Sequence, residues 1–234
     1  MPNIQAALNA MVAAVGAEKD RPKGHKYPVV VTISRDDGTH GHLIAEKLSQ
    51  KLGVPIFDKE LVEKLAERLD TDHKVVKALD EGVGRARDMW LYRLVTGVDV
   101  TPGTYRRHLV NVILSLAHMG GIIVGRGAHV VLNTGAALRV RLTGTIPACA
   151  KRISEEKGIS FEDAIKEVKR INSKRGKFVW DMFQSRLNEP QNFDIVINMD
   201  RMSNIDQIVS TLAAAVEAIH VSVETDEEAE AKKG

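Results

Sequence analysis

A strand, a glycine-bearing turn and a helix follow one another directly between Val29 and Leu48, and this segment constrains the fold more than any other. Its sequence is VVVTISRDDGTHGHLIAEKL. The first part, Val29–Ser34, is apolar and rich in β-branched residues, which is typical of a strand buried on both faces. Leu43–Leu52 has apolar residues at helical spacing, and Gly53 ends it. This layout is typical of a phosphate-binding loop, in which backbone N–H groups and a helix N-terminus meet an anion.

The loop between this strand and this helix lacks the lysine that normally completes a phosphate-binding loop. The run Gly38–His42, GTHGH, stands where Gly-x-Gly-Lys-Ser/Thr is expected. Gly38 and Gly41 allow the backbone to approach a phosphate closely, the two histidines are candidate donors, and Arg35 is a candidate fixed charge. Three interpretations stay open: a working nucleotide enzyme, a variant that takes its positive charge from elsewhere, or a relic that only binds. The plainer alternative is a strand-to-helix turn that uses glycines for its geometry.

Strand-like and helix-like segments alternate along the rest of the chain. Further strands are expected at 54–58, 122–124, 138–142 and 193–199. Helices are expected at 59–69, at 105–119, from Pro147, from Ser160 with that serine as N-cap, and at about 204–219. The helix from Ser160 is expected to end in the basic stretch Lys169–Lys177. Strands that alternate with helices predict an α/β fold with a parallel sheet covered on both faces, whereas residues 70–104 are less regular.

Composition limits what the chain does. With 44% hydrophobic and 27% charged residues the sequence is ordinary for a globular protein, and a formal net charge of +2 is too small to argue for a nucleic-acid partner. The single cysteine, Cys149, excludes an intrachain disulfide. The N-terminus lacks a basic n-region, and no run approaches the ~18 apolar residues that span a bilayer. We therefore expect a cytoplasmic protein without a membrane partner.

Three regions are expected along the chain. Residues 1–27 form an N-terminal helical extension and linker, which packs either on the body or on a second copy of the chain, so a homodimer stays open. Residues 28–221 form the main domain. Residues 222–234 form an acidic tail that is expected to be disordered.

Three further positions carry candidate chemistry. Gly125-Arg126-Gly127 ends a buried strand, where open α/β sheets place ligands, and an arginine there suits bidentate contact with a phosphate; the alternative is a surface turn. Asp58, followed by Lys59, also closes a strand and either orients a substrate or magnesium or caps the next helix. The basic segment Arg170–Lys177 suits a mobile cover over a transferred phosphoryl group, and is otherwise a solvated helix face. The histidines lack metal-ligand spacing, and Gly-x-Ser-x-Gly is absent, so neither protein-bound zinc nor a serine hydrolase is predicted.

These segments, in this order, resemble the cytidylate kinase-like family, a branch of the nucleoside monophosphate kinases. The resemblance covers roughly Val29 to Ala215 and rests on TISRDDGTHG, VPIFDKELVEKLA, YRRHLVNVILSLAHMGGIIVGRGAHVVL, RVRLTG, KRISEEKGIS and FDIVINMDRMS. The family loop typically reads Ser-Arg-Glu-x-Gly-Ser-Gly-Gly-Arg, so the absent lysine is similar to the family pattern. His42, in place of the family arginine, is a departure, as is Asn172 where the family tends to have an acidic residue.

The resemblance implies a three-layer P-loop kinase core with a five-stranded parallel sheet, a helical monophosphate-binding region at 58–119 and a lid at 152–178. It also implies a site. The residues implied to line the donor phosphates are Arg35, Gly38, Thr39, His40, Gly41 and His42. Arg126 is implied to contact phosphate at the sheet edge, and Arg152, Lys174 and Arg175 stand at basic lid positions. Asp58, Lys59 and Arg126 are candidates for binding the acceptor, and Thr39 with Asp58 for holding the water shell of magnesium.

The leading functional hypothesis is magnesium-dependent phosphoryl transfer from ATP to a nucleoside monophosphate such as CMP or dCMP. Such chemistry needs no protein nucleophile, because it proceeds by positioning the two phosphates in line and stabilising their charge. One alternative is a nucleotide-binding regulatory protein with weak or no catalysis, which the loop histidines and Asn172 favour. The other keeps the kinase chemistry but uses a non-nucleotide small metabolite as acceptor.

Overall fold

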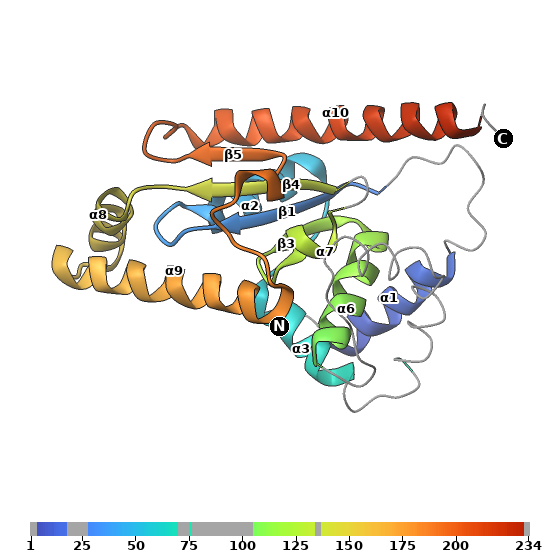
Figure 1. Cartoon of the computed structure of the whole chain (residues 1–234), viewed down its shortest axis with the longest axis horizontal. Coiled ribbons are helices and arrows are strands. Elements are labelled where there is room, and N and C mark those ends of the chain that lie inside the picture. Colours follow the sequence, from blue (N-terminus) through green and yellow to red (C-terminus); the bar gives the residue numbers. More distant parts are fainter. Residues whose placement is uncertain (1–3, 18–27, 70–74, 76–104, 134–136, 232–234) are drawn as a thin grey trace.

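The computed structural model describes residues 4–17, 28–69, 75, 105–133 and 137–231. Five strands form one all-parallel sheet in the order β2-β3-β1-β4-β5 (Figure 1). The strands are β1 Val30–Arg35, β2 Ile56–Phe57, β3 Gly121–Val124, β4 Ala137–Thr143 and β5 Ile195–Asn198. Each begins or ends within three residues of the strand that the sequence predicts, so the five-stranded α/β prediction is confirmed.

The order of the strands brings separate loops to one edge of the sheet. Ile33 of β1 is in register with Val124 of β3, and Arg35 with Leu142 of β4. Because all five strands are parallel, the loops after β1, β3 and β4 leave the sheet on the same side. This is the edge at which open α/β sheets bind ligands.

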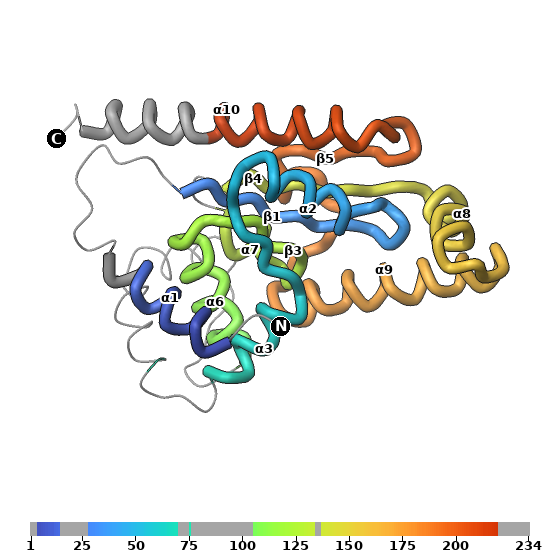
Figure 2. The backbone as a smooth tube through the Cα atoms, turned by 180° about the vertical axis from the view of Figure 1, so that it is seen from behind, coloured from blue at the N-terminus to red at the C-terminus, as the bar shows by residue number. Residues whose placement is uncertain are grey.

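Helices cover both faces of the sheet, and each face has its own hydrophobic core. On one face lie α2 Gly41–Leu52 and α10 Ile205–Ala231 (Figure 2). The two helices contact each other and bury residues such as Leu48 and Leu212 against the strands. The other face carries α3 Lys59–Leu69, α6 Tyr105–Met119, α7 Ala128–Val131 and the C-terminal part of α9 Phe161–Phe183. The helix α8 Ile146–Lys157 packs on α9, and a short 3₁₀ turn, Pro190–Asn192, precedes β5.

The N-terminal helix α1 Ile4–Ala17 packs on α3 and α6 within the same chain. Its Leu8 and Met11 are fully buried in the core of that face. The sequence left open whether this segment packs on the body of the chain or on a second copy. In the structure it packs on the body of the chain. The linker at 18–27 and most of the irregular region 70–104 lie outside the described residues.

Two helices extend further than the sequence predicts. The basic stretch Lys169–Lys177 lies in the middle of α9, not at its end, because Val179 and Phe183 beyond it are buried in the core and favour continued helix. The helix α10 runs on to Ala231, through residues expected to be disordered. Glutamate and alanine, which are frequent there, are strong helix formers.

The described residues meet neither the requirements of a membrane-spanning helix nor those of a metal site formed by clustered side chains. Within them, no helix combines the length and apolar character that crossing a membrane requires. No cluster of three or more histidine, cysteine or acidic side chains in the same part of the chain could hold a metal ion.

Candidate active site

The loop after β1 is folded tightly against α8. Gly38 has φ +75°, and a Cβ there would lie 2.5 Å from the carbonyl oxygen of Cys149. Only glycine meets both demands, since this backbone region strains other residues and α8 leaves no room for a side chain. His40 also has positive φ, 51°, and occupies the N-cap position of α2 without a side-chain capping bond.

Backbone donors at the beginning of the loop are already engaged. The N–H of Asp36 donates to the carbonyl of Leu142 at 3.0 Å, and the N–H of Asp37 donates to Oδ1 of Asn172 at 2.8 Å. The Thr39 hydroxyl donates to the carbonyl of Asp36 at 2.8 Å. The N–H groups at the start of α2 have no partner within the helix, and they carry its partial positive charge. The part of the loop suited to an anion is therefore the stretch from Gly38 to the first turn of α2.

Asp36 ties the loop to β4. Its carboxylate accepts from Arg141 Nη2 at 2.5 Å and from the Thr143 hydroxyl at 2.8 Å. Both of its oxygens are thus occupied by structural partners.

A cavity of about 380 Å³ opens beside the loop, between the sheet edge and α9. Among the described residues, six cationic side chains and no acidic one line it. They are Arg35, Lys59, Arg126, Arg170, Lys174 and Arg175. A space lined in this way suits a ligand with several negative charges.

Three of these arginines raise the local positive potential together. Burial and the charges of Arg175 and Arg126 lower the pKa of Arg35 to about 10. Burial is also the main cause that lowers the pKa of Arg126 and of Arg175. Gly125 makes this crowding possible, because a Cβ at that position would lie 2.8 Å from Arg35 Nη1. All three arginines stay protonated at neutral pH, and an anion would relieve their mutual repulsion.

Arg126 is held in place from two sides. Its Nη1 donates to Glu63 of α3 at 2.7 Å, and its guanidinium lies 3.8 Å from the centre of the Phe178 ring. Its Nε is buried and has no hydrogen-bond partner in the described part of the chain. Lys59 lies 3.8 Å from the same Glu63. One carboxylate therefore orients two cations of the cavity.

Arg175 of α9 reaches the loop from the opposite side of the cavity. Its Nη1 donates to the carbonyl of Arg35 at 3.0 Å, and its Nη2 lies 3.5 Å from Asp37 Oδ1. Burial raises the pKa of Asp37, against the opposing effect of Arg175. Arg175 and Asn172 together hold α9 against the loop after β1.

The structure brings some predicted site residues together and places others apart. Arg35, Lys59, Arg126, Lys174 and Arg175 share the cavity, and Arg170 joins them. Asp58 does not line the cavity; its Oδ1 accepts from the N–H of Leu61 at 2.8 Å and caps α3, which is one of the two roles left open by the sequence. His42 is 71% exposed on α2 and pairs with Glu46 at 3.3 Å.

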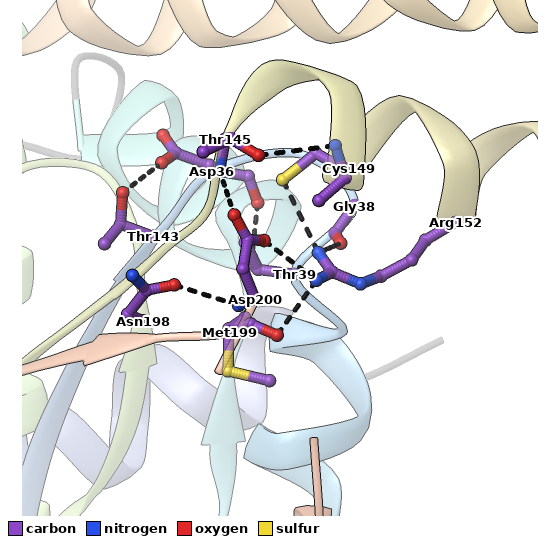
Figure 3. A network of polar contacts seen from close by, with 11 residues as sticks. Asp36, Gly38, Thr39, Thr143, Thr145, Cys149, Arg152, Asn198, Met199 and Asp200 are labelled. Atoms are coloured by element: carbon purple, nitrogen blue, oxygen red, sulfur yellow. Dashed lines mark hydrogen bonds and ion pairs between the residues drawn. The ribbon is translucent and has the colours of Figure 1, made fainter. Parts of the chain in front are cut away.

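Arg152 lies outside the cavity in a network of its own (Figure 3). Its guanidinium donates to the carbonyls of Gly38 and Met199 and to the Asp200 carboxylate, each at 2.9 Å. The resemblance implies a lid position for this arginine, whereas here it is bonded to the loop after β1 and to the turn after β5.

Several residues of the site carry no signal in the sequence. Glu63 lies on a helix face of ordinary appearance, and only the fold shows that it orients Arg126. Ser34, which lines the cavity, shares a 3.1 Å hydrogen bond with Nδ1 of the buried His129. That histidine stacks on Phe193 with 4.6 Å between ring centres, and burial lowers its pKa to about 3. It is therefore neutral at physiological pH.

Both the sequence and the fold of this chain are similar to those of known proteins. Residues 30–201 match the sequence profile of the cytidylate kinase-like family. An uncharacterized protein from Eubacterium ventriosum ATCC 27560 is similar in structure, with a TM-score of 0.62 and 19% identity, over 81% of this chain and 98% of that one. A shikimate kinase from Bacteroides thetaiotaomicron gives a TM-score of 0.44 at 17% identity, covering 81% and 98%. A gluconokinase from Sinorhizobium meliloti 1021 gives 0.46 at 11% identity, covering 86% and 99%. No curated protein is a significant match.

Proposed function

Because the chain belongs to the cytidylate kinase-like family, we propose that it transfers a phosphoryl group from ATP to a nucleoside monophosphate, with CMP or dCMP as the first candidates. The observation that carries the proposal is the cavity beside the loop, which in the described part of the chain has six cationic and no acidic lining residues. A phosphorylated acceptor supplies the charge that such a cavity lacks. A neutral acceptor would leave the excess positive charge of the cavity uncompensated, so the cavity favours a monophosphate over an uncharged metabolite.

The loop and the cavity would hold the two phosphate groups from opposite sides. The backbone N–H groups from Gly38 to the first turn of α2 would bind the donor phosphates. Arg126 would bind the acceptor phosphate, since its position is fixed by Glu63 and by the Phe178 ring. Arg35 and Arg175 lie near both and would stabilise the charge on the transferred group.

No side chain needs to act as a nucleophile in this scheme. The rate enhancement would come from alignment of donor and acceptor and from positive charge that is in place before the reaction. The long helix α9 supplies Arg170, Lys174 and Arg175, so closure of this helix over the cavity would complete the charge and exclude water.

The chemistry of the loop fits magnesium bound mainly through water and nucleotide phosphates. Mg²⁺ keeps several waters and takes one or two carboxylates. Oδ2 of Asp37 is a buried carboxylate oxygen with no hydrogen-bond partner in the described residues. The Thr39 hydroxyl donates a hydrogen bond to the backbone carbonyl of Asp36, which leaves the lone pairs of the hydroxyl oxygen available. When bound, the ion would neutralise charge on the donor phosphates; Asp37 and Thr39 are the residues that would hold it.

The test is an ADP-release assay with ATP, magnesium and a panel of monophosphates and uncharged metabolites. Arg126→Ala should lower kcat/KM for the acceptor about 10- to 100-fold, the usual effect of losing a charged hydrogen bond. Arg139→Ala is a matched control: this arginine is also ion-paired, with Asp194 at 2.6 Å, but it does not line the cavity. Equal rates for Arg126→Ala and Arg139→Ala would refute the role of Arg126.

A second candidate function, nucleotide binding without turnover, is favoured by one observation. The Gly38–His42 stretch contributes no fixed side-chain cation, and His42 is exposed and paired with Glu46. A regulatory protein of this kind would bind ATP in a calorimetric titration but release no ADP with any acceptor. Acceptor-dependent ADP would eliminate it.

A further inference from the structure

Arg152 has no guanidinium N–H₂ group left over for a substrate. Nη1 donates to the carbonyl oxygen of Gly38 at 2.9 Å and approaches Cys149 Sγ at 3.7 Å. Nη2 donates to the carbonyl of Met199 and to Oδ1 of Asp200. The side chain is only 19% exposed. Figure 3 shows the guanidinium between the loop after β1 and the end of β5.

Asp200, the acidic partner of Arg152, is itself held by the backbone. Its Oδ2 accepts from the N–H of Thr145 at 2.7 Å, and its own N–H donates to Oδ1 of Asn198 at 2.9 Å. The hydrogen bond from the Thr145 N–H is the main reason that the pKa of the Asp200 carboxyl is lowered. The carboxylate is thus fixed and charged, and it fixes Arg152 in turn.

The bond to Gly38 sets the orientation of one peptide group in the phosphate loop. In a planar trans peptide the C=O and the following N–H point in opposite directions. Because the Gly38 carbonyl points to Arg152, the N–H of Thr39 points away from it. The α8 side of Gly38 is filled by the backbone of Cys149, 2.5 Å from where a Cβ would be. An anion therefore reaches this peptide from the other side, which is the side that the Thr39 N–H faces.

We propose that Arg152, fixed by Asp200, is a positioning residue that turns the Gly38–Thr39 peptide so that its N–H faces the donor phosphate. Without the brace, the peptide is free to flip, and a flipped carbonyl would present a negative dipole to the phosphate. The assignment differs from a lid arginine that touches the transferred group. It rests on the proposed function, because it assumes that this loop binds the donor.

The first experiment tests the brace without a ligand or any turnover. Amide NMR of the ligand-free protein would follow the Thr39 N–H in Arg152→Ala, Asp200→Ala and Arg152→Lys. The matched control is Lys151→Ala, the neighbouring residue on α8, whose side chain is 73% exposed. We expect both alanine variants to shift the Thr39 resonance and speed its exchange, the lysine variant to do so less, and the control not at all. The remaining resonances show whether each variant is folded. An unchanged Thr39 amide in folded Arg152→Ala would overturn the proposal.

The second experiment uses calorimetric ATP binding together with the kinase assay. We expect Arg152→Ala and Asp200→Ala each to weaken ATP binding about tenfold, the equivalent of one lost charge-assisted hydrogen bond, and to leave the acceptor KM unchanged. The double variant should be no weaker than Arg152→Ala, because both act through one contact. A fall in kcat for Arg152→Ala alone, with Asp200→Ala like the wild type, would mean that Arg152 touches the reacting phosphate and would overturn the proposal. Wild-type protein that makes no ADP would refute the proposed function, while the amide result still decides the brace.

Discussion

Replacement of Gly38 by alanine tests whether α8 rests directly on the phosphate loop. The first cost is in the backbone: Gly38 has φ +75°, and the left-handed region costs an L-residue about 1–2 kcal/mol. The second is in packing: the new Cβ would lie 2.5 Å from the Cys149 carbonyl oxygen, a backbone atom that cannot rotate away. Overpacking of this kind costs about 1–3 kcal/mol. We expect Gly38→Ala to lower the free energy of unfolding by roughly 2–5 kcal/mol.

Gly53→Ala separates these two costs. Gly53 also has positive φ, +66°, but apart from its own chain neighbours no atom of the described residues lies within 4 Å of the position that a Cβ would take. Its replacement should therefore cost only the backbone strain, roughly 1–2 kcal/mol. Urea denaturation of both variants gives the difference directly, provided that the m-values are equal. If Gly38→Ala and Gly53→Ala lose the same free energy, the loop is not packed under α8 and the reasoning is refuted.

Three further predictions concern side chains around the site. Asp58→Ala should lose about 1 kcal/mol of stability with the cap of α3, whereas Asp58→Asn should keep both stability and kcat/KM; an inactive but stable Asp58→Asn would assign the carboxylate to binding. Burial lowers the pKa of His129 to about 3, below the 6.5 of an unfolded histidine, so the unfolded chain takes up the proton first. Stability should then fall as pH drops from about 6.5 toward 3, by about 1.4 kcal/mol per pH unit for this group, and His129→Gln should flatten that part of the unfolding profile. Burial raises the pKa of the Cys149 thiol to about 11, so the native protein should not react with iodoacetamide at pH 8, and rapid labelling before unfolding would contradict its placement.

Local sequence was enough to predict the elements that form the ligand edge. The strand, loop and helix around Gly38 are contiguous, and the strand before Arg126 is a short apolar run. Once the strands are parallel, their C-terminal ends must share an edge. That is why Arg35 and Arg126, 91 positions apart by their numbers, could be expected near one another, and the cavity contains both.

The partners of individual side chains could not be predicted in the same way. Arg152 bonds to Gly38, 114 positions away, and to Asp200, 48 positions away. Nothing in the sequence around Arg152 distinguishes a lid arginine from a brace, because both are basic residues on an amphipathic helix. Glu63 likewise resembles any exposed glutamate of α3 until the fold places it 2.7 Å from Arg126. Contacts of this range depend on how helices pack on the sheet, which periodicity does not encode.

The loop lacks a lysine, and the structure shows which other cationic side chains lie beside it. A single lysine on the loop would supply one mobile point charge, whereas here three arginines come from β1, from the turn after β3 and from α9. Their positions are fixed by different partners: Arg126 by Glu63, and Arg175 by the Arg35 carbonyl. Guanidinium groups are always charged near neutral pH and offer paired donors to phosphate, so under the proposed function the three arginines would replace the charge of one lysine and add directionality. Burial and, after it, the charges of Arg175 and Arg126 lower the pKa of Arg35, and a bound anion would relieve the repulsion among the three arginines. A loop without lysine is therefore consistent with an anion site whose charge is assembled by the fold.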